Sequence, residues 1–131
     1  MREIYIYPAV FDYADDGISV FFPDLPGCLT CGKTDEEASK MAEEALGLHI
    51  CGMEEDNDDI PEPSKGNEIT LEPNQRIFLV RVWMPKARNE VKPVYVKKTL
   101  TIPSFLNKAA QEARINFSNL LQEALREKLG I

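Results

Sequence analysis

The sequence predicts an α+β protein in two parts: an N-terminal sheet domain of order β-β-β-α-β and a C-terminal strand–helix–helix module. Apolar strand segments joined by turn residues fill the first half of the chain. The charge changes sign near residue 85, since residues 1–85 hold 6 Lys+Arg against 18 Asp+Glu, whereas residues 86–131 hold 9 against 4. We therefore predict a domain at 1–85, a linker at 86–93 and a second domain at 94–131.

The N-terminal domain begins with three predicted strands. Residues 3–13 are apolar on both faces, so this strand is expected inside the sheet and covered on both sides or at an interface. Residues 14–17 end in Asp-Gly, a strong hairpin signal, and residues 18–22 return as the second strand. A proline-flanked turn at 23–27 then leads to a short strand at 28–31.

A helix and a fourth strand complete this domain. Thr34 and Glu37 form a capping box that opens the helix. Residues 54–65 are polar and contain two prolines, which indicates a loop, and residues 76–84 form a strand that is apolar on both faces. The predicted buried stripe of the helix consists of Ala38, Met41, Ala42, Ala45, His49 and Gly52, widened by Leu46, Ile50 and Met53.

The C-terminal module starts with an alternating segment, residues 94–102, which Pro103 ends. Two apolar-periodic helices follow, separated by a break at 114–116, and the second runs to Leu129. A single short strand has two open edges, so we expect it to pair with the same strand of a second copy. Pairing of the two strands would produce a homodimer, and a tetramer is also possible in this arrangement. The segment resembles the ribbon-helix-helix family of dimeric bacterial repressors of the Arc and MetJ type.

A two-stranded ribbon can read the DNA major groove with alternate side chains. Lys97, Thr99 and Thr101 share one face of the predicted strand and are the expected base contacts. The net charge of +5 over residues 86–131 suits a phosphate backbone. An exposed strand face of Lys and Thr is the alternative interpretation.

The start of the second helix is the expected contact with a DNA phosphate. The free backbone N–H groups of Asn116, Phe117 and Ser118 would hold the phosphate, with the helix dipole assisting. Asn116 is also an ordinary N-cap residue, and both roles can hold together.

The motif Phe22-Pro23-Asp24-Leu25-Pro26-Gly27-Cys28 precedes Thr30, Gly32, Thr34 and a Glu/Ala-rich helix. Together with the strand at 7–11, it resembles the N-terminal domain of HicB-type antitoxins. The resemblance implies a partial ribonuclease-H-like fold that blocks a small, basic, mRNA-cleaving toxin of the HicA type, and a C-terminal domain that represses its own operon by binding operator DNA. Asp15, Asp16 and Asp24 lie on turns and are the expected toxin contacts. Cys31 departs from the family, where a longer polar residue is usual.

Two other classes of function compete with this interpretation. One is a ribbon-helix-helix repressor whose N-terminal domain senses a ligand or only oligomerises, and the other is an enzyme. The formal zinc set of Cys28, Cys31, His49 and Cys51 does not converge in the predicted elements. Turn chemistry accounts for Asp15, Asp16 and Asp24, and no predicted strand presents a spaced pair of acids on one face. We therefore expect no cofactor, no metal and no catalysis, with buried thiols and a core histidine at 49.

Two remaining expectations concern RNA and location. Phe78 and Trp83 could stack RNA bases, but the acidity of the domain favours packing in the core. The three cysteines, an odd number, fit a reducing compartment, and the chain has no run of 18 apolar residues. We expect a cytoplasmic protein with no secretory signal and no membrane partner.

Overall fold

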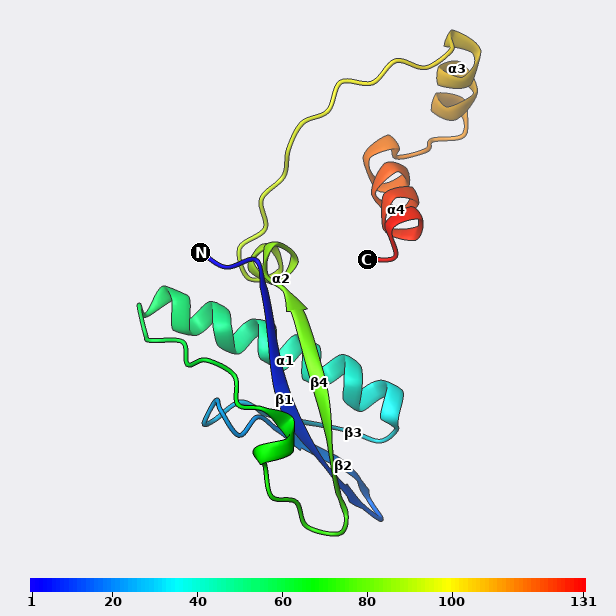
Figure 1. Cartoon of the computed structure of the whole chain (residues 1–131). Helices are drawn as coiled ribbons and strands as arrows, with labels where there is room; N and C mark the ends of the chain where they lie inside the picture. Colours follow the sequence, from blue (N-terminus) through cyan, green and yellow to red (C-terminus); the bar gives the residue numbers. More distant parts are fainter. The chain divides into compact units, whose positions relative to one another are not determined.

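The computed structural model describes all 131 residues, which divide into two units, Met1–Val94 and Tyr95–Ile131. The first unit contains a four-stranded antiparallel sheet of order β3-β2-β1-β4 (Figure 1). Its elements are β1 (Ile4–Ala14), β2 (Gly17–Phe21), β3 (Leu29–Gly32), α1 (Asp35–Glu55), the short 3-10 helix η1 (Gly66–Glu68), β4 (Gln75–Trp83) and α2 (Met84–Val91). The second unit contains α3 (Ser104–Glu112) and α4 (Phe117–Leu129).

β1 lies inside the sheet, as its two apolar faces predict. It pairs with β2 from Val10 to Ala14 and with β4 from Ile4 to Asp12. The hairpin turn between β1 and β2 is where the Asp-Gly signal placed it, and Gly17 has φ +145°, a value that side-chain-bearing residues rarely adopt. β4, the last strand in the chain, forms the edge of the sheet next to β1, and β3 forms the opposite edge.

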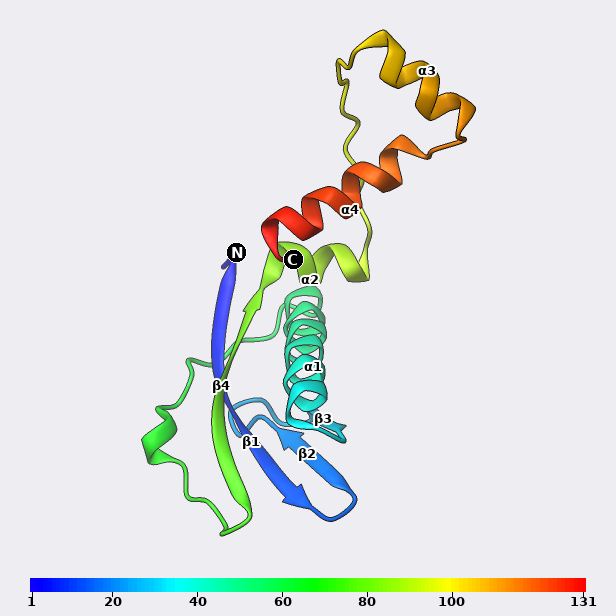
Figure 2. The same cartoon turned by 90° about the vertical axis from the view of Figure 1, so that its right-hand side faces the viewer.

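Helix α1 covers one face of the sheet (Figure 2). The Thr34 side chain accepts a hydrogen bond from the Glu37 N–H at 3.1 Å, which confirms the predicted cap. The buried row of α1 is Ala38, Ala42, Leu46, Gly47 and Ile50. The predicted stripe was therefore wrong at its edge, since Gly52 is exposed and His49 is half-buried. Two adjacent rows of α1 are apolar, and only the packing shows which of them faces the sheet.

After α1 the chain passes to the other face of the sheet, where η1 lies (Figure 2). The Tyr7 hydroxyl donates to the Pro61 carbonyl oxygen, and burial raises the pKa of Tyr7 to about 12. At the other end, the Asn74 side chain donates to Asp12 at 2.6 Å and the Tyr13 N–H donates to the Asn74 carbonyl at 3.0 Å. The loop predicted at 54–65 is thus attached to the sheet through Pro61, and the chain that follows it is attached through Asn74.

The linker predicted at 86–93 is instead largely helix α2, which packs on α1. Pro85 stands in the first turn of α2, where its missing N–H costs no hydrogen bond. Met84 and Ala87 are buried. The Arg88 guanidinium holds both carboxylate oxygens of Glu54, at 2.7 and 3.1 Å, and this pairing raises the pKa of Arg88. A helix of eight residues with one buried turn gives too short a pattern to be recognised in the sequence.

The core-packing prediction for Phe78 and Trp83 was also wrong. Their side chains are 47% and 37% exposed. The reason is the position of β4 at the end of the sheet, because an end strand has a neighbour on one side only.

The second unit consists of two amphipathic helices and an extended lead segment. Residues 93–103 form neither helix nor strand in the single chain, so the ribbon stays a prediction. The break between the helices is confirmed: Arg114 has φ +58°, and the Asn116 side chain accepts from the Asn119 N–H at 3.0 Å as the cap of α4. The helices leave large apolar side chains uncovered, among them Phe105, Leu106, Ile115, Leu120, Leu125 and Leu129.

Candidate functional site

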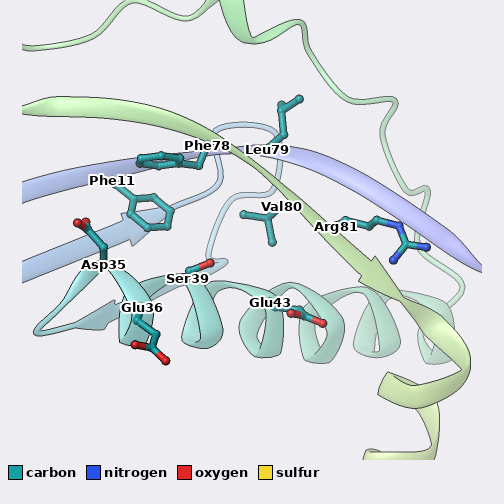
Figure 3. Close-up of a pocket in the computed structure, with 9 residues that line it drawn as sticks. All are labelled: Phe11, Asp35, Glu36, Ser39, Glu43, Phe78, Leu79, Val80 and Arg81. Carbon is teal, nitrogen blue, oxygen red and sulfur yellow. The ribbon is translucent and has the colours of Figure 1, made fainter. Parts of the chain in front are cut away.

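A groove of about 620 Å³ lies between α1 and the end strand β4 of the first unit (Figure 3). β4 and β1 supply its apolar side, and α1 supplies its polar side. The lining residues are Phe11, Asp35, Glu36, Ser39, Glu43, Phe78, Leu79, Val80 and Arg81. The groove exists because no strand continues the sheet beyond β4.

The apolar side of the groove is built on an aromatic pair. The rings of Phe11 and Phe78 lie edge to face, with centroids 4.7 Å apart and an interplanar angle of 61°. Phe11 is 2% exposed and belongs to the core. Its ring holds the Phe78 ring in place, although Phe78 itself remains open to solvent. Leu79, the next residue, is 67% exposed, but its side chain points away from α1 (Figure 3). The aromatic pair therefore offers the rigid apolar surface of the groove, of the kind that contributes to protein interfaces.

The polar side of the groove carries three carboxylates, and β4 contributes the single cation of the lining. Asp35 and Glu36 stand in the first turn of α1, where the helix dipole stabilises negative charge, and Glu43 lies two turns further on. The Tyr13 hydroxyl donates to Asp35 Oδ1 at 2.6 Å, which orients this carboxylate and raises the pKa of Tyr13. Arg81 is the cation of the lining and forms no salt bridge. The local charge favours a cationic ligand.

The aspartates predicted from the sequence lie outside this groove. Asp15 and Asp16 are exposed in the β1–β2 turn. Asp24 accepts hydrogen bonds from the Ser64 N–H, at 2.9 Å, and from the Ser64 hydroxyl, so it holds the segment after α1 in place. Asp24 also lines a second hollow, of about 720 Å³, together with His49 and the acidic residues Asp56, Asp58 and Asp59. His49 thus faces this hollow rather than the core.

Sequence reasoning missed Asp35, Glu36, Glu43 and Phe78 as site residues. Asp35 and Glu36 stand in the first turn of the helix, where the helix dipole alone accounts for them, and Phe78 was predicted to lie in the core. The sequence held one weak indication that part of this strand would stay exposed. Residues 76–84 are apolar on both faces, but the domain has only one long helix to cover them.

The DNA-contact residues predicted from the sequence all lie in the second unit and are exposed. Lys97, Thr99 and Thr101 lie in the extended segment before α3. Asn116 caps α4, so its side chain is engaged, while Phe117 and Ser118 begin the helix. The unit has 6 Lys+Arg against 3 Asp+Glu.

The cysteines have three different environments. Cys28 is buried, its thiol donates to the Ala45 carbonyl at 3.6 Å, and burial raises the pKa of Cys28 to about 11. Cys51 is partly buried against the core. The prediction of buried thiols was wrong for Cys31, which is exposed because β3 is the other end strand. No three His, Cys, Asp or Glu side chains are grouped to hold a metal ion.

None of the helices combines the length and the apolar character that a membrane span requires.

The chain belongs to the HicB-like antitoxin family of bacterial toxin–antitoxin systems, whose family model matches residues 7–125. It is 42% identical over 66 residues to antitoxin HicB 2 of Photorhabdus laumondii, covering 50% of this chain and 48% of that protein. It is 36% identical over 77 residues to a 14.9 kDa protein from the rep-hol intergenic region of Haemophilus phage HP1, covering 59% and 58%. The matches thus span about half the length of these curated relatives.

Solved structures extend the similarity to the whole chain. A chain of a toxin–antitoxin complex from Streptococcus pneumoniae has 30% identity and a TM-score of 0.60, covering 95% of this chain and 99% of that one. A chain of the HicA3 and HicB3 toxin–antitoxin complex has 27% identity and a TM-score of 0.52, covering 60% of this chain and 98% of that one. The crystal structure of antitoxin HicB from Burkholderia pseudomallei, at 23% identity and a TM-score of 0.53, shares the fold.

Proposed function

We propose that this chain is an antitoxin that neutralises a small, basic, mRNA-cleaving toxin of the HicA type and represses its own operon by binding operator DNA. The observation that carries the proposal is the division of an antitoxin-family chain into two units of opposite charge. The first unit has 9 Lys+Arg against 19 Asp+Glu, and the second has 6 against 3. Each unit therefore suits a different partner.

Neutralisation is assigned to the acidic sheet unit, the partial ribonuclease-H-like domain of the sequence resemblance. A toxin that binds RNA must expose a basic surface. The acidic surface of this unit would attract that toxin and would repel RNA. The turn residues Asp15, Asp16 and Asp24 contribute to this field. The complexes that contain similar chains support a toxin as the partner.

Operator binding is assigned to the second unit as a ribbon-helix-helix homodimer. Residues 94–102 of two copies would form the antiparallel ribbon, with Lys97, Thr99 and Thr101 facing the bases. The N-terminus of α4 would hold a phosphate. The uncovered apolar side chains of α3 and α4 support dimerisation, because a second copy would bury them.

Two measurements on the full chain test this function. Co-expression of the chain with the toxin from the adjacent reading frame should restore growth, and the association rate should fall steeply with added salt, since charge steering is screened over about 10 Å at 0.1 M. In operator gel shifts, Thr99→Ala should weaken specific binding by about 1–3 kcal/mol and leave binding to random DNA nearly unchanged. A chain that represses the operon but never rescues growth would be a plain repressor whose first unit senses a ligand or only oligomerises.

A further inference from the structure

We propose that the groove between α1 and β4 binds an extended, basic segment of the toxin, and that this segment pairs with the free edge of β4 as a fifth strand. The inference rests on the proposed neutralisation and names the surface that performs it. Three features support it: the open edge, the aromatic side of the groove and the carboxylates facing it.

The outer edge of β4, Gln75–Trp83, pairs with no strand, because β1 occupies its other side. Its first residue is engaged locally, since the Gln75 N–H donates to the Glu72 carbonyl at 3.0 Å and Arg76 Nη1 donates to the Gln75 carbonyl at 2.7 Å, so the free edge begins after Gln75. Proteins usually protect such an edge with proline, a bulge or many charges, since it is a template for another strand. β4 contains no proline, and its register with β1 runs unbroken from Gln75 to Trp83. Arg76 and Arg81 are its charged residues, and the rest of its centre is Ile-Phe-Leu-Val. Strand addition would satisfy the free backbone groups.

The groove determines which side chains such a strand would carry. Alternate residues of an added strand would point into the groove, beside Phe78 and Val80, which lie on the same side of β4 as α1. Successive inward side chains would be about 6.8 Å apart. Long Lys or Arg side chains at these positions would lay their apolar stems on Phe78 and reach Glu36 or Glu43 with their charges. The expected segment therefore has a basic residue at every second position.

The charge distribution decides between this partner and two others. A second copy could pair its β4 with this β4 about a two-fold axis, which would make one continuous sheet. Both α1 helices would then lie on the same face of that sheet, and each would bring Asp35, Glu36 and Glu43 to the side of β4. Their like charges would oppose that contact. Single-stranded RNA could stack on Phe78, but the same carboxylates would repel its phosphates. A basic protein segment meets attraction at both sides of the groove.

The test compares two neighbouring glutamates on α1. Glu43 lines the groove and Glu44 does not, although both are exposed and a Lys substitution changes the net charge equally. The full chain and its variants are titrated with the toxin from the adjacent reading frame, and the association and dissociation rates are measured. Glu43→Lys should weaken binding at least about tenfold, mainly through faster dissociation, whereas Glu44→Lys should change only the association rate by a small factor. Phe78→Ala should also accelerate dissociation.

Amide hydrogen exchange of the same complex tests strand pairing. Toxin binding should slow exchange at alternate amides of β4, those that point away from β1, and leave the β3 edge unchanged. If the unaltered chain binds the toxin but Glu43→Lys and Glu44→Lys weaken it equally, or if the β4 amides gain no protection, the groove proposal is overturned while neutralisation stands. If the unaltered chain binds no toxin, the proposed function itself fails.

Discussion

Two glycines of α1 provide a sharp test of how closely α2 packs against it. Gly47 and Gly52 both lie inside the helix, but an added methyl group would meet opposite surroundings. At position 47 the new Cβ would lie 2.9 Å from the Ala87 Cβ and 3.2 Å from Val82 Cγ2. At position 52 it would meet nothing within 4 Å. The two substitutions are chemically identical and differ in packing alone.

The expected change in the free energy of unfolding follows from two opposing effects. Replacing glycine by alanine inside a helix stabilises it by about 0.8–1.0 kcal/mol at either position. At position 47 this gain is outweighed, because carbon atoms prefer separations of about 3.5–4.0 Å and an extra methyl group in a filled contact costs about 1–3 kcal/mol. Gly52→Ala should therefore stabilise the unit by about 1 kcal/mol, and Gly47→Ala should destabilise it by about 1 kcal/mol. The difference corresponds to about thirtyfold in the unfolding equilibrium.

Urea unfolding followed by tryptophan fluorescence measures both values. The chain has one tryptophan, Trp83, which lies at the end of β4 and reports on the first unit. Protein concentration must be the same for all variants, because self-association would shift the apparent stability. Equal stabilisation by both substitutions would show that α2 does not rest on Gly47 and would refute the reasoning.

Three further outcomes are expected. Gly32→Ala should cost about 3 kcal/mol or more, seen as a large drop in the thermal midpoint, because its Cβ would lie 2.5 Å from the Ala38 backbone nitrogen, which cannot rotate away. Arg88→Lys should cost about 1–2 kcal/mol in urea unfolding, since an ammonium cannot reproduce the two-pronged contact with Glu54; no loss would mean that the pair is dispensable. Because burial raises the pKa of the Cys28 thiol from 9.0 to about 11, its contribution to stability should be complete below pH 9 and lost as the pH rises toward 11. Cys28→Ala should make the stability curve less steep in that range, and an unchanged curve would contradict the assignment.

Local sequence signals determined much of the secondary structure. The Asp-Gly turn fixed the β1–β2 hairpin, Thr34 and Glu37 fixed the start of α1, and Asn116 fixed the start of α4. Each of these is a short-range effect, in which a side chain satisfies a backbone group a few residues away. The family resemblance was likewise carried by a contiguous motif, and the family match confirms it.

The candidate site depended instead on contacts between distant segments. β4 joins the sheet beside β1, so Phe78 and Trp83 of an apolar strand remain partly exposed. The packing of Met84, Ala87 and Arg88 on α1 makes a helix of a segment that has no clear period of its own.

The sequence by itself predicted a division into two parts of opposite charge and determined several local starts of the helices and the first hairpin, but it placed the division before α2 rather than after it. Only the tertiary structure decided which strand stands at the end of the sheet and which carboxylates of α1 face it. The physical reason is that strand order depends on the burial of the whole set of apolar faces, a balance that no single segment encodes.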